Sequence, residues 1–130
     1  MKKIMIVDDD PDIRKTIKQA LEFFSPDYEV ICVESGNKCY ELLRKDTIPD
    51  LILLDIMMPG MSGWMLTDRL RENPSWKDIP IVFLTARSDD FAEVIGKKIG
   101  IDFIRKPFDL IDIKKRIDRI FSNSKKYPKM

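Results

Sequence analysis

The chain has 130 residues, 44% of them hydrophobic and 35% charged, with a formal net charge of +1 at pH 7. This length fits one domain with a single core, and the balanced charge gives no sign of a nucleic-acid or membrane partner. No hydrophobic run approaches the ~20 residues of a membrane span, and the first residues turn acidic too soon for a signal peptide.

Two residue types limit the chemistry further. The sequence contains no histidine, which excludes imidazole acid–base catalysis and His-ligated zinc. Any chemistry must use carboxylates, hydroxyls, lysines or a group supplied by a partner. Cys32 and Cys39 have neither a metal-ligand spacing nor a disulfide pattern, so we interpret them as ordinary thiols of a cytoplasmic protein.

Short hydrophobic runs predict the strands. They are rich in Ile, Val and Leu and do not alternate with polar residues, which is typical of strands buried on both faces of a parallel sheet. A fifth strand is predicted just before the last helix. The predicted strands cover residues 4–7, 30–33, 51–54, 81–84 and 103–105.

Helical periodicity fills the segments between these runs. Asp10 is expected to cap the first helix, with Pro11 in its first turn. Ser35 and Ser62 are expected to cap the second and third helices. A fourth helix is predicted around 91–98. The last helix has a hydrophobic stripe of Leu110, Ile113, Ile117, Ile120 and Phe121.

The chain therefore reads as five consecutive strand–helix units, (βα)5. This alternation predicts an α/β fold: a doubly wound five-stranded parallel sheet with helices on both faces. We expect one domain over residues 1–122 and a short basic C-terminal tail over 123–130. Trp76, which lies in a polar turn, is expected to be partly exposed.

In such sheets, functional sites form at the carboxyl ends of the strands. Three aspartates, Asp8, Asp9 and Asp10, follow the first strand. Asp55, Thr85 and Lys106 follow the third, fourth and fifth. Grouped carboxylates suit a hard divalent cation such as Mg²⁺, and a nearby lysine and hydroxyl suit the oxygens of a phosphoryl group.

The same residues carry a family resemblance. The acidic pair Asp8-Asp9, the segment DIMMPGMSG (55–63), TA (85–86) and KPF (106–108) occur in this order at the predicted strand ends. Together they resemble the receiver domain of response regulators, the phospho-accepting half of two-component signalling. The resemblance covers roughly residues 2–122 and implies a flavodoxin-like strand order, 2-1-3-4-5.

The resemblance implies roles for individual residues. Asp55 would accept the phosphoryl group in a Mg²⁺-dependent reaction. Asp9, Asp55 and the backbone carbonyl of Met57 would bind Mg²⁺ directly, and Asp8 would hold a metal-bound water. Lys106 would pair with the phosphoryl group and would precede a cis peptide bond.

It also implies a switch and partners. Thr85 would donate its hydroxyl to the phosphoryl group, and the ring of Phe103 would turn inward as Thr85 moves. A sensor histidine kinase or a phosphotransfer protein would supply the phosphoryl group. A downstream protein, or a second copy in a homodimer, would read the face of the fourth helix, fifth strand and fifth helix. We expect a stand-alone signalling phospho-acceptor, which assists its own phosphorylation and dephosphorylation but is not otherwise an enzyme.

Other functions are weighed against this one. A haloacid-dehalogenase-like phosphotransferase or phosphatase also uses an aspartate, Mg²⁺ and a lysine, but its Asp-x-Asp motif continues with Thr or Val, whereas here Pro11 follows Asp10. A calcium loop starting at Asp8 would need glycine where Ile13 stands. An interaction module with a vestigial acidic site does not explain the complete set of site residues. Asp10 and Asp12 are expected to serve the helix start.

Overall fold

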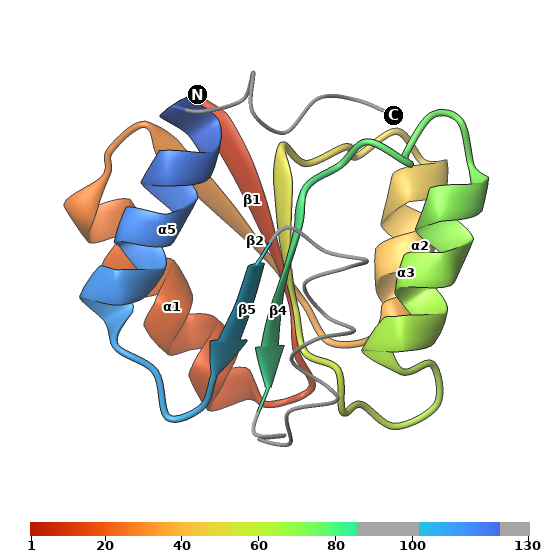
Figure 1. The fold of residues 1–130 in the computed structure, drawn as a ribbon, viewed down its shortest axis with the longest axis horizontal. Helices are drawn as coiled ribbons and strands as arrows, with labels where there is room; N and C mark the ends of the chain where they lie inside the picture. The colour runs from red at the N-terminus through yellow and green to blue at the C-terminus, as the bar shows by residue number, and fades with distance from the viewer. Residues whose placement is uncertain (86–101, 123–130) are drawn as a thin grey trace.

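The computed structural model describes residues 1–85 and 102–122, apart from the side chain of Thr85. It contains five parallel strands in the order β2-β1-β3-β4-β5. Figure 1 shows α1 and α5 on one face of this sheet and α2 and α3 on the other. The α/β fold and the strand order implied by the resemblance are both confirmed. The strands are β1 (Lys2–Val7), β2 (Tyr28–Val33), β3 (Leu51–Leu54), β4 (Ile81–Thr85) and β5 (Asp102–Arg105).

The described helices begin where the sequence predicts caps. The Asp10 carboxylate accepts the Asp12 N–H at 2.9 Å, and the hydroxyls of Ser35 and Ser62 accept backbone N–H groups at 3.1 and 3.3 Å. The predicted helix at 91–98 lies outside the described residues. The described helices are α1 (Pro11–Phe24), α2 (Gly36–Arg44), α3 (Gly63–Glu72) and α5 (Leu110–Ser122).

The core consists of two hydrophobic layers separated by the sheet. Alternate residues of β1 enter opposite layers, as Met5 and Ile6 do. All four residues of β3 are buried, as expected for a central strand covered on both faces. The prediction of full burial is wrong for β2, where Cys32 is exposed, because β2 is an edge strand of the sheet.

Trp76 corrects a second expectation. Its side chain is buried, with only 7% of its surface exposed. The ring packs edge-on against Tyr40 of α2, with 5.4 Å between the ring centroids. The polar residues next to Trp76 in the sequence therefore led to a wrong prediction of exposure. The surface that covers its ring comes from α2, which is distant in the chain.

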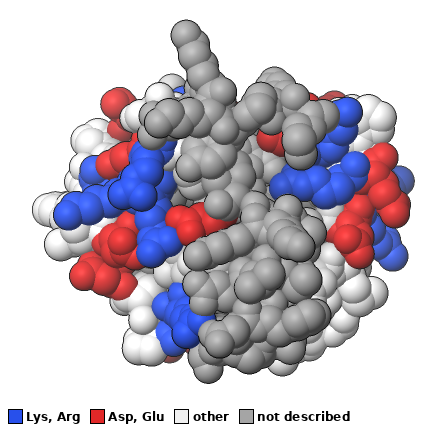
Figure 2. All heavy atoms as spheres, in the orientation of Figure 1, with Lys and Arg blue, Asp and Glu red and all other residues white. Residues whose placement is uncertain are grey.

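The described surface carries mixed charge. Figure 2 shows Lys and Arg side chains interspersed with Asp and Glu on the face turned to the viewer. Among residues 1–85 and 102–122, no helix has both the length and the hydrophobicity needed to cross a membrane.

Candidate functional site

The carboxyl edge of the sheet brings the side chains after β1 and β3 to one level. Val7 pairs in register with Leu54, so the next residues, Asp8 and Asp55, leave adjacent strands together. The Asp55 N–H donates to the Val7 carbonyl at 2.9 Å, and the Asp8 N–H donates to the Val33 carbonyl at 3.1 Å. Asp8 and Asp55 are both buried. The sheet therefore holds two buried carboxylates in fixed positions.

Asp9 completes a carboxylate cluster at this edge. One oxygen each from Asp8, Asp9 and Asp55 lies within 4.8 Å of the others. Asp9 is exposed, so the cluster has a side open to solvent. Three carboxylate oxygens at this spacing fit the ligand preference of Mg²⁺, which takes oxygen ligands and retains several waters. Asp10 is not in the cluster, because its carboxylate caps α1.

Lys106 lies against the buried side of this cluster. It follows β5, and its Nζ is 2.9 Å from Asp8 Oδ2 and 3.4 Å from Asp55 Oδ2. The peptide bond between Lys106 and Pro107 is cis, which confirms that expectation. One ammonium group therefore offsets part of the charge of two buried carboxylates.

The site's electrostatics raise two pKa values. Burial raises the pKa of the Asp55 carboxyl and the charge of Asp8 raises it further, while Lys106 and the Met57 N–H oppose this rise. Burial by itself lowers the pKa of Lys106, but its bonds to Asp8 and Asp55 outweigh burial and the net pKa is raised. The lysine thus stays protonated at neutral pH, and deprotonation of Asp55 is costly.

The loop after β3 places Asp55 through close backbone packing. A Cβ atom added at Gly63 would lie 2.6 Å from the Asp55 carbonyl oxygen, so only glycine fits there. The Gly63 N–H donates to the Ile56 carbonyl at 2.9 Å. Gly60 has a positive φ of 75°, a conformation that glycine adopts without strain. The start of α3 is thereby packed directly onto the strand end that carries Asp55.

Arg14 supports the site and was not singled out from the sequence. Its Nη1 donates to the Asp8 carbonyl at 2.7 Å, which ties α1 to the end of β1. The only sequence signal is its position in the first turn of α1, six residues after Asp8. That signal is too weak to identify a contact between a side chain and a main-chain carbonyl.

Three other residues were predicted for the site or its switch: Met57, Thr85 and Phe103. Met57 donates its N–H to Asp55 Oδ1 at 3.1 Å, and its side chain is exposed. Thr85 ends β4 and pairs in register with Arg105, but its predicted hydroxyl contact lies outside what the structure describes. Phe103 is buried in the same core layer as Phe83, its register partner on β4.

A family model and several curated proteins match this chain. The family model described as "Response regulator receiver domain" matches residues 4–118. The phosphate regulon transcriptional regulatory protein PhoB of Pseudomonas aeruginosa is 38% identical over 92% of this chain and 51% of its own length. A probable cyclic di-GMP phosphodiesterase of Vibrio cholerae is 35% identical over 94% of this chain and 27% of its own length.

Solved structures of receiver domains have a similar fold. The receiver domain of a signal transduction histidine kinase from Syntrophus aciditrophicus has a TM-score of 0.84 at 31% identity, covering 95% of this chain and 92% of that one. This chain spans about half or less of the length of the first curated relatives that it matches. The shared region is thus a receiver domain that makes up part of longer relatives. The chain belongs to the response regulator receiver domain family.

Proposed function

We propose that this receiver domain accepts a phosphoryl group on Asp55 from a phosphohistidine of a partner protein, in a Mg²⁺-dependent reaction. The observation that carries the proposal is the cluster of Asp8, Asp9 and Asp55 oxygens within 4.8 Å, with Lys106 beside it. The sequence has no histidine, so the donor histidine lies outside these 130 residues. A sensor histidine kinase or a phosphotransfer protein supplies it.

The proposed transfer is a single displacement at phosphorus. An Asp55 oxygen forms a bond to phosphorus, the phosphorus–nitrogen bond of the donor breaks, and the imidazole leaves and takes up a proton. Bound Mg²⁺ would neutralise charge on the phosphoryl oxygens. Asp9, Asp55 and the Met57 carbonyl would hold it directly, and Asp8 through water. Lys106 would turn from the carboxylates to the phosphoryl oxygens, and Thr85 would donate its hydroxyl.

The acceptor is tested by incubation with acetyl phosphate and Mg²⁺, followed by intact mass measurement. The wild-type chain should gain one phosphoryl group, and Asp55→Asn should gain none. Asp10→Asn is the matched control, because Asp10 is adjacent in sequence but outside the cluster, and asparagine caps helices equally well. Full labelling of Asp55→Asn would show that another residue is the acceptor. Steady hydrolysis of small phosphate esters would favour the haloacid-dehalogenase-like alternative.

The output proposed is a change of surface. The phosphoryl group would hold Thr85 near Asp55 and keep Phe103 in its buried position, shifting the population between two conformations. A downstream protein would read the exposed side of β5 and α5, and we infer no direct contact with nucleic acid or membrane. The free thiols Cys32 and Cys39 fit the cytoplasm, where we place the reaction.

Hydrogen exchange with the phosphoryl mimic beryllofluoride tests the switch. Exchange of the β5 amides around Phe103 should slow when beryllofluoride and Mg²⁺ are present, and the Asp55→Asn variant should show no such change. A response confined to the loops of Asp9 and Asp55 would contradict the switch and leave the chain as a phosphoryl store.

A further inference from the structure

β2 forms one edge of the sheet, and its composition favours pairing with further strands. The strand, Tyr28–Val33, is rich in β-branched residues, has a single charge at Glu29, and contains neither proline nor glycine. Edge strands of this kind pair with strands of other chains unless their free main-chain groups are protected. The free main-chain groups of β2 are therefore a hazard to the monomer.

Every second residue of β2 directs its main-chain groups away from β1. The Val33 carbonyl accepts the Asp8 N–H at 3.1 Å, so Val33 faces the β1 side. Successive residues of a strand alternate in this respect, and the N–H and carbonyl of one residue point to the same side. Tyr28, Val30 and Cys32 therefore face the free edge, with Val30 at the centre.

Two side chains of α1 occupy both main-chain groups of Val30. Glu22 Oε2 accepts the Val30 N–H at 2.9 Å, and Lys18 Nζ donates to the Val30 carbonyl at 2.7 Å. Lys18 and Glu22 also pair with each other at 3.0 Å. They thus supply the donor and the acceptor that a neighbouring strand would supply, and both bonds are charge-assisted. An incoming strand must displace both side chains before it can pair at Val30.

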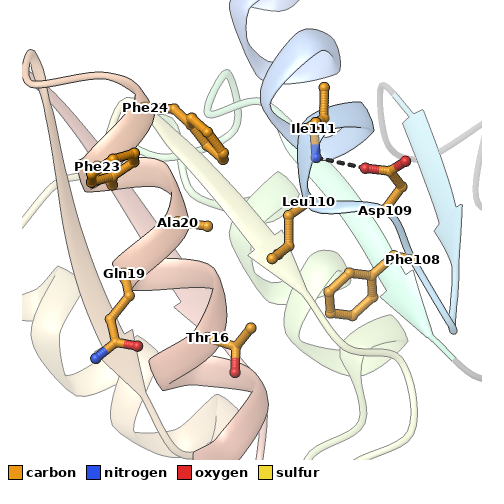
Figure 3. Close-up of a pocket in the computed structure, with 9 residues that line it drawn as sticks. All are labelled: Thr16, Gln19, Ala20, Phe23, Phe24, Phe108, Asp109, Leu110 and Ile111. Carbon is orange, nitrogen blue, oxygen red and sulfur yellow. Dashed lines mark hydrogen bonds between the residues drawn. The ribbon is translucent and has the colours of Figure 1, made fainter.

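The Lys18–Glu22 pair is separate from the other features of α1. The residues that line the open groove between α1 and the segment that enters α5 include neither Lys18 nor Glu22 (Figure 3). The pair also lies outside the carboxylate cluster of the candidate site. Among the described residues, no side chain bonds the main chain of Cys32 as the pair bonds that of Val30. The protection is therefore concentrated at the centre of the edge.

We propose that the Lys18–Glu22 pair keeps the β2 edge closed to a second copy of the chain. Without the pair, two β2 strands would join antiparallel about a two-fold axis at Val30, and two sheets would become one. At this register Val30 meets Val30, and Tyr28 meets Cys32 of the other copy. Glu29 lies opposite Ile31 of the other copy, so no like charges are directly opposed.

The pair prevails because its hydrogen bonds lie within one chain. A dimer must repay the loss of free movement of two molecules, whereas a side chain of α1 is already beside the strand. The Tyr28 N–H is also engaged, since it donates to the Ser25 carbonyl at 2.9 Å. With Val30 occupied, a second copy could pair only near the two ends of the strand. Such a contact is too short to hold two sheets together.

Amide hydrogen exchange of the wild-type chain, measured under reducing conditions, tests whether the pair protects the edge. Val30 and Cys32 both direct their N–H groups away from β1, but only the Val30 N–H has a side-chain acceptor. Corrected for intrinsic rates, the Val30 amide should exchange at least about tenfold more slowly than the Cys32 amide. Equal protection of the two amides would overturn the proposal.

Sedimentation velocity over a concentration series tests what happens without the pair. Lys18→Ala combined with Glu22→Ala should lower the dissociation constant for self-association at least about tenfold relative to wild type, because the central pairing position is then free. Glu41→Ala combined with Lys45→Ala is the matched control. That pair has the same spacing and the same 3.0 Å separation, but lies on the surface of α2. It should associate no more than the wild-type chain.

A proline at the edge identifies the surface that associates. Cys32→Pro, added to the Lys18→Ala and Glu22→Ala variant, removes an N–H that faces away from β1 and should return the chain to a monomer. Without the proline, the Cys32 amide of the dimer should gain about tenfold protection, a measurement that does not depend on how the proline variant folds.

Three results would overturn the proposal. One is a folded Lys18→Ala and Glu22→Ala variant that stays monomeric at submillimolar concentration. Another is equal association of the α2 control variant. The third is a dimer whose Cys32 amide exchanges as fast as in the wild-type chain, because such a dimer uses a different surface.

Discussion

The two edges of the sheet place acidic side chains in opposite situations. At the amino edge, Asp50 accepts the Lys3 N–H at 2.7 Å, and Asp118 of α5 accepts hydrogen bonds from Tyr28 and Lys114. At the carboxyl edge, Asp8, Asp9 and Asp55 lie against one another, with Lys106 between two of them. The hydrogen bonds at the amino edge link β1 to the residue that precedes β3, and β2 to α5.

This difference separates a structural use of charge from a chemical one. A carboxylate paired with donors stabilises the fold and leaves little capacity to bind anything else. Clustered carboxylates repel one another and destabilise the fold unless a cation joins them. The carboxyl edge thus retains binding capacity at a cost in stability.

The largest expected effect is on Lys106. Lys106→Met should lower the free energy of unfolding by about 3 kcal/mol at neutral pH, because the buried carboxylates lose the cation that pairs with them. Lys114→Met at the amino edge should cost only about 0.5 kcal/mol, because the Lys114–Asp118 pair is partly exposed. Urea denaturation of both variants measures the difference. Equal losses would contradict the comparison.

Mg²⁺ should act on one edge only. At a concentration ten times its dissociation constant it should add about 1.4 kcal/mol to the free energy of unfolding, through binding to the folded state. Asp9→Ala should remove most of this response and could itself stabilise the metal-free fold by relieving repulsion. Asp12→Ala, outside the cluster, should keep the response. Thermal denaturation with and without Mg²⁺ provides the test, and an unchanged response in Asp9→Ala would refute the ligand set.

The smallest effect expected is a pH dependence. Because the pKa of Asp55 is raised by burial and by Asp8, the folded state binds that proton more tightly than the unfolded state. Ionised Asp55 therefore destabilises the fold above its folded pKa, and the penalty disappears as pH falls through that value. Asp55→Asn should be more stable than wild type by on the order of 1 kcal/mol at neutral pH. This gain should shrink toward about pH 4.

Glu22 should contribute a pH dependence of stability opposite to that of Asp55. The pKa of Glu22 is lowered, chiefly by the Val30 N–H and with help from Lys18. Its stabilisation is present at neutral pH and lost as pH falls through the folded pKa. Glu22→Gln should therefore be less stable than wild type at neutral pH, with a difference that fades in acid. Lys106 remains charged throughout this range, because its pKa is raised. Urea denaturation midpoints of Asp55→Asn, Glu22→Gln and the wild-type chain, measured from neutral to acidic pH, test these two opposite pH dependences.

Local patterns in the sequence predicted much of the fold. The hydrophobic run at Leu51–Leu54 matches β3 residue for residue, and Asp10, Ser35 and Ser62 cap helices as expected. These features depend on hydrogen bonds and burial within a few residues. The same alternation of strands and helices placed Asp8, Asp9, Asp55 and Lys106 at one edge, because parallel strands all end on the same side.

Tertiary packing decided what separated segments do to one another. Lys106 reaches Asp8 across 98 positions of sequence, and only the assembled sheet sets that distance. Arg14 supports Asp8, Gly63 fits against Asp55, and Trp76 is buried under Tyr40 for the same reason. A sequence pattern specifies which residue types follow a strand, since that depends on neighbours along the chain. It does not specify contacts between side chains from different elements, because those depend on how the layers pack.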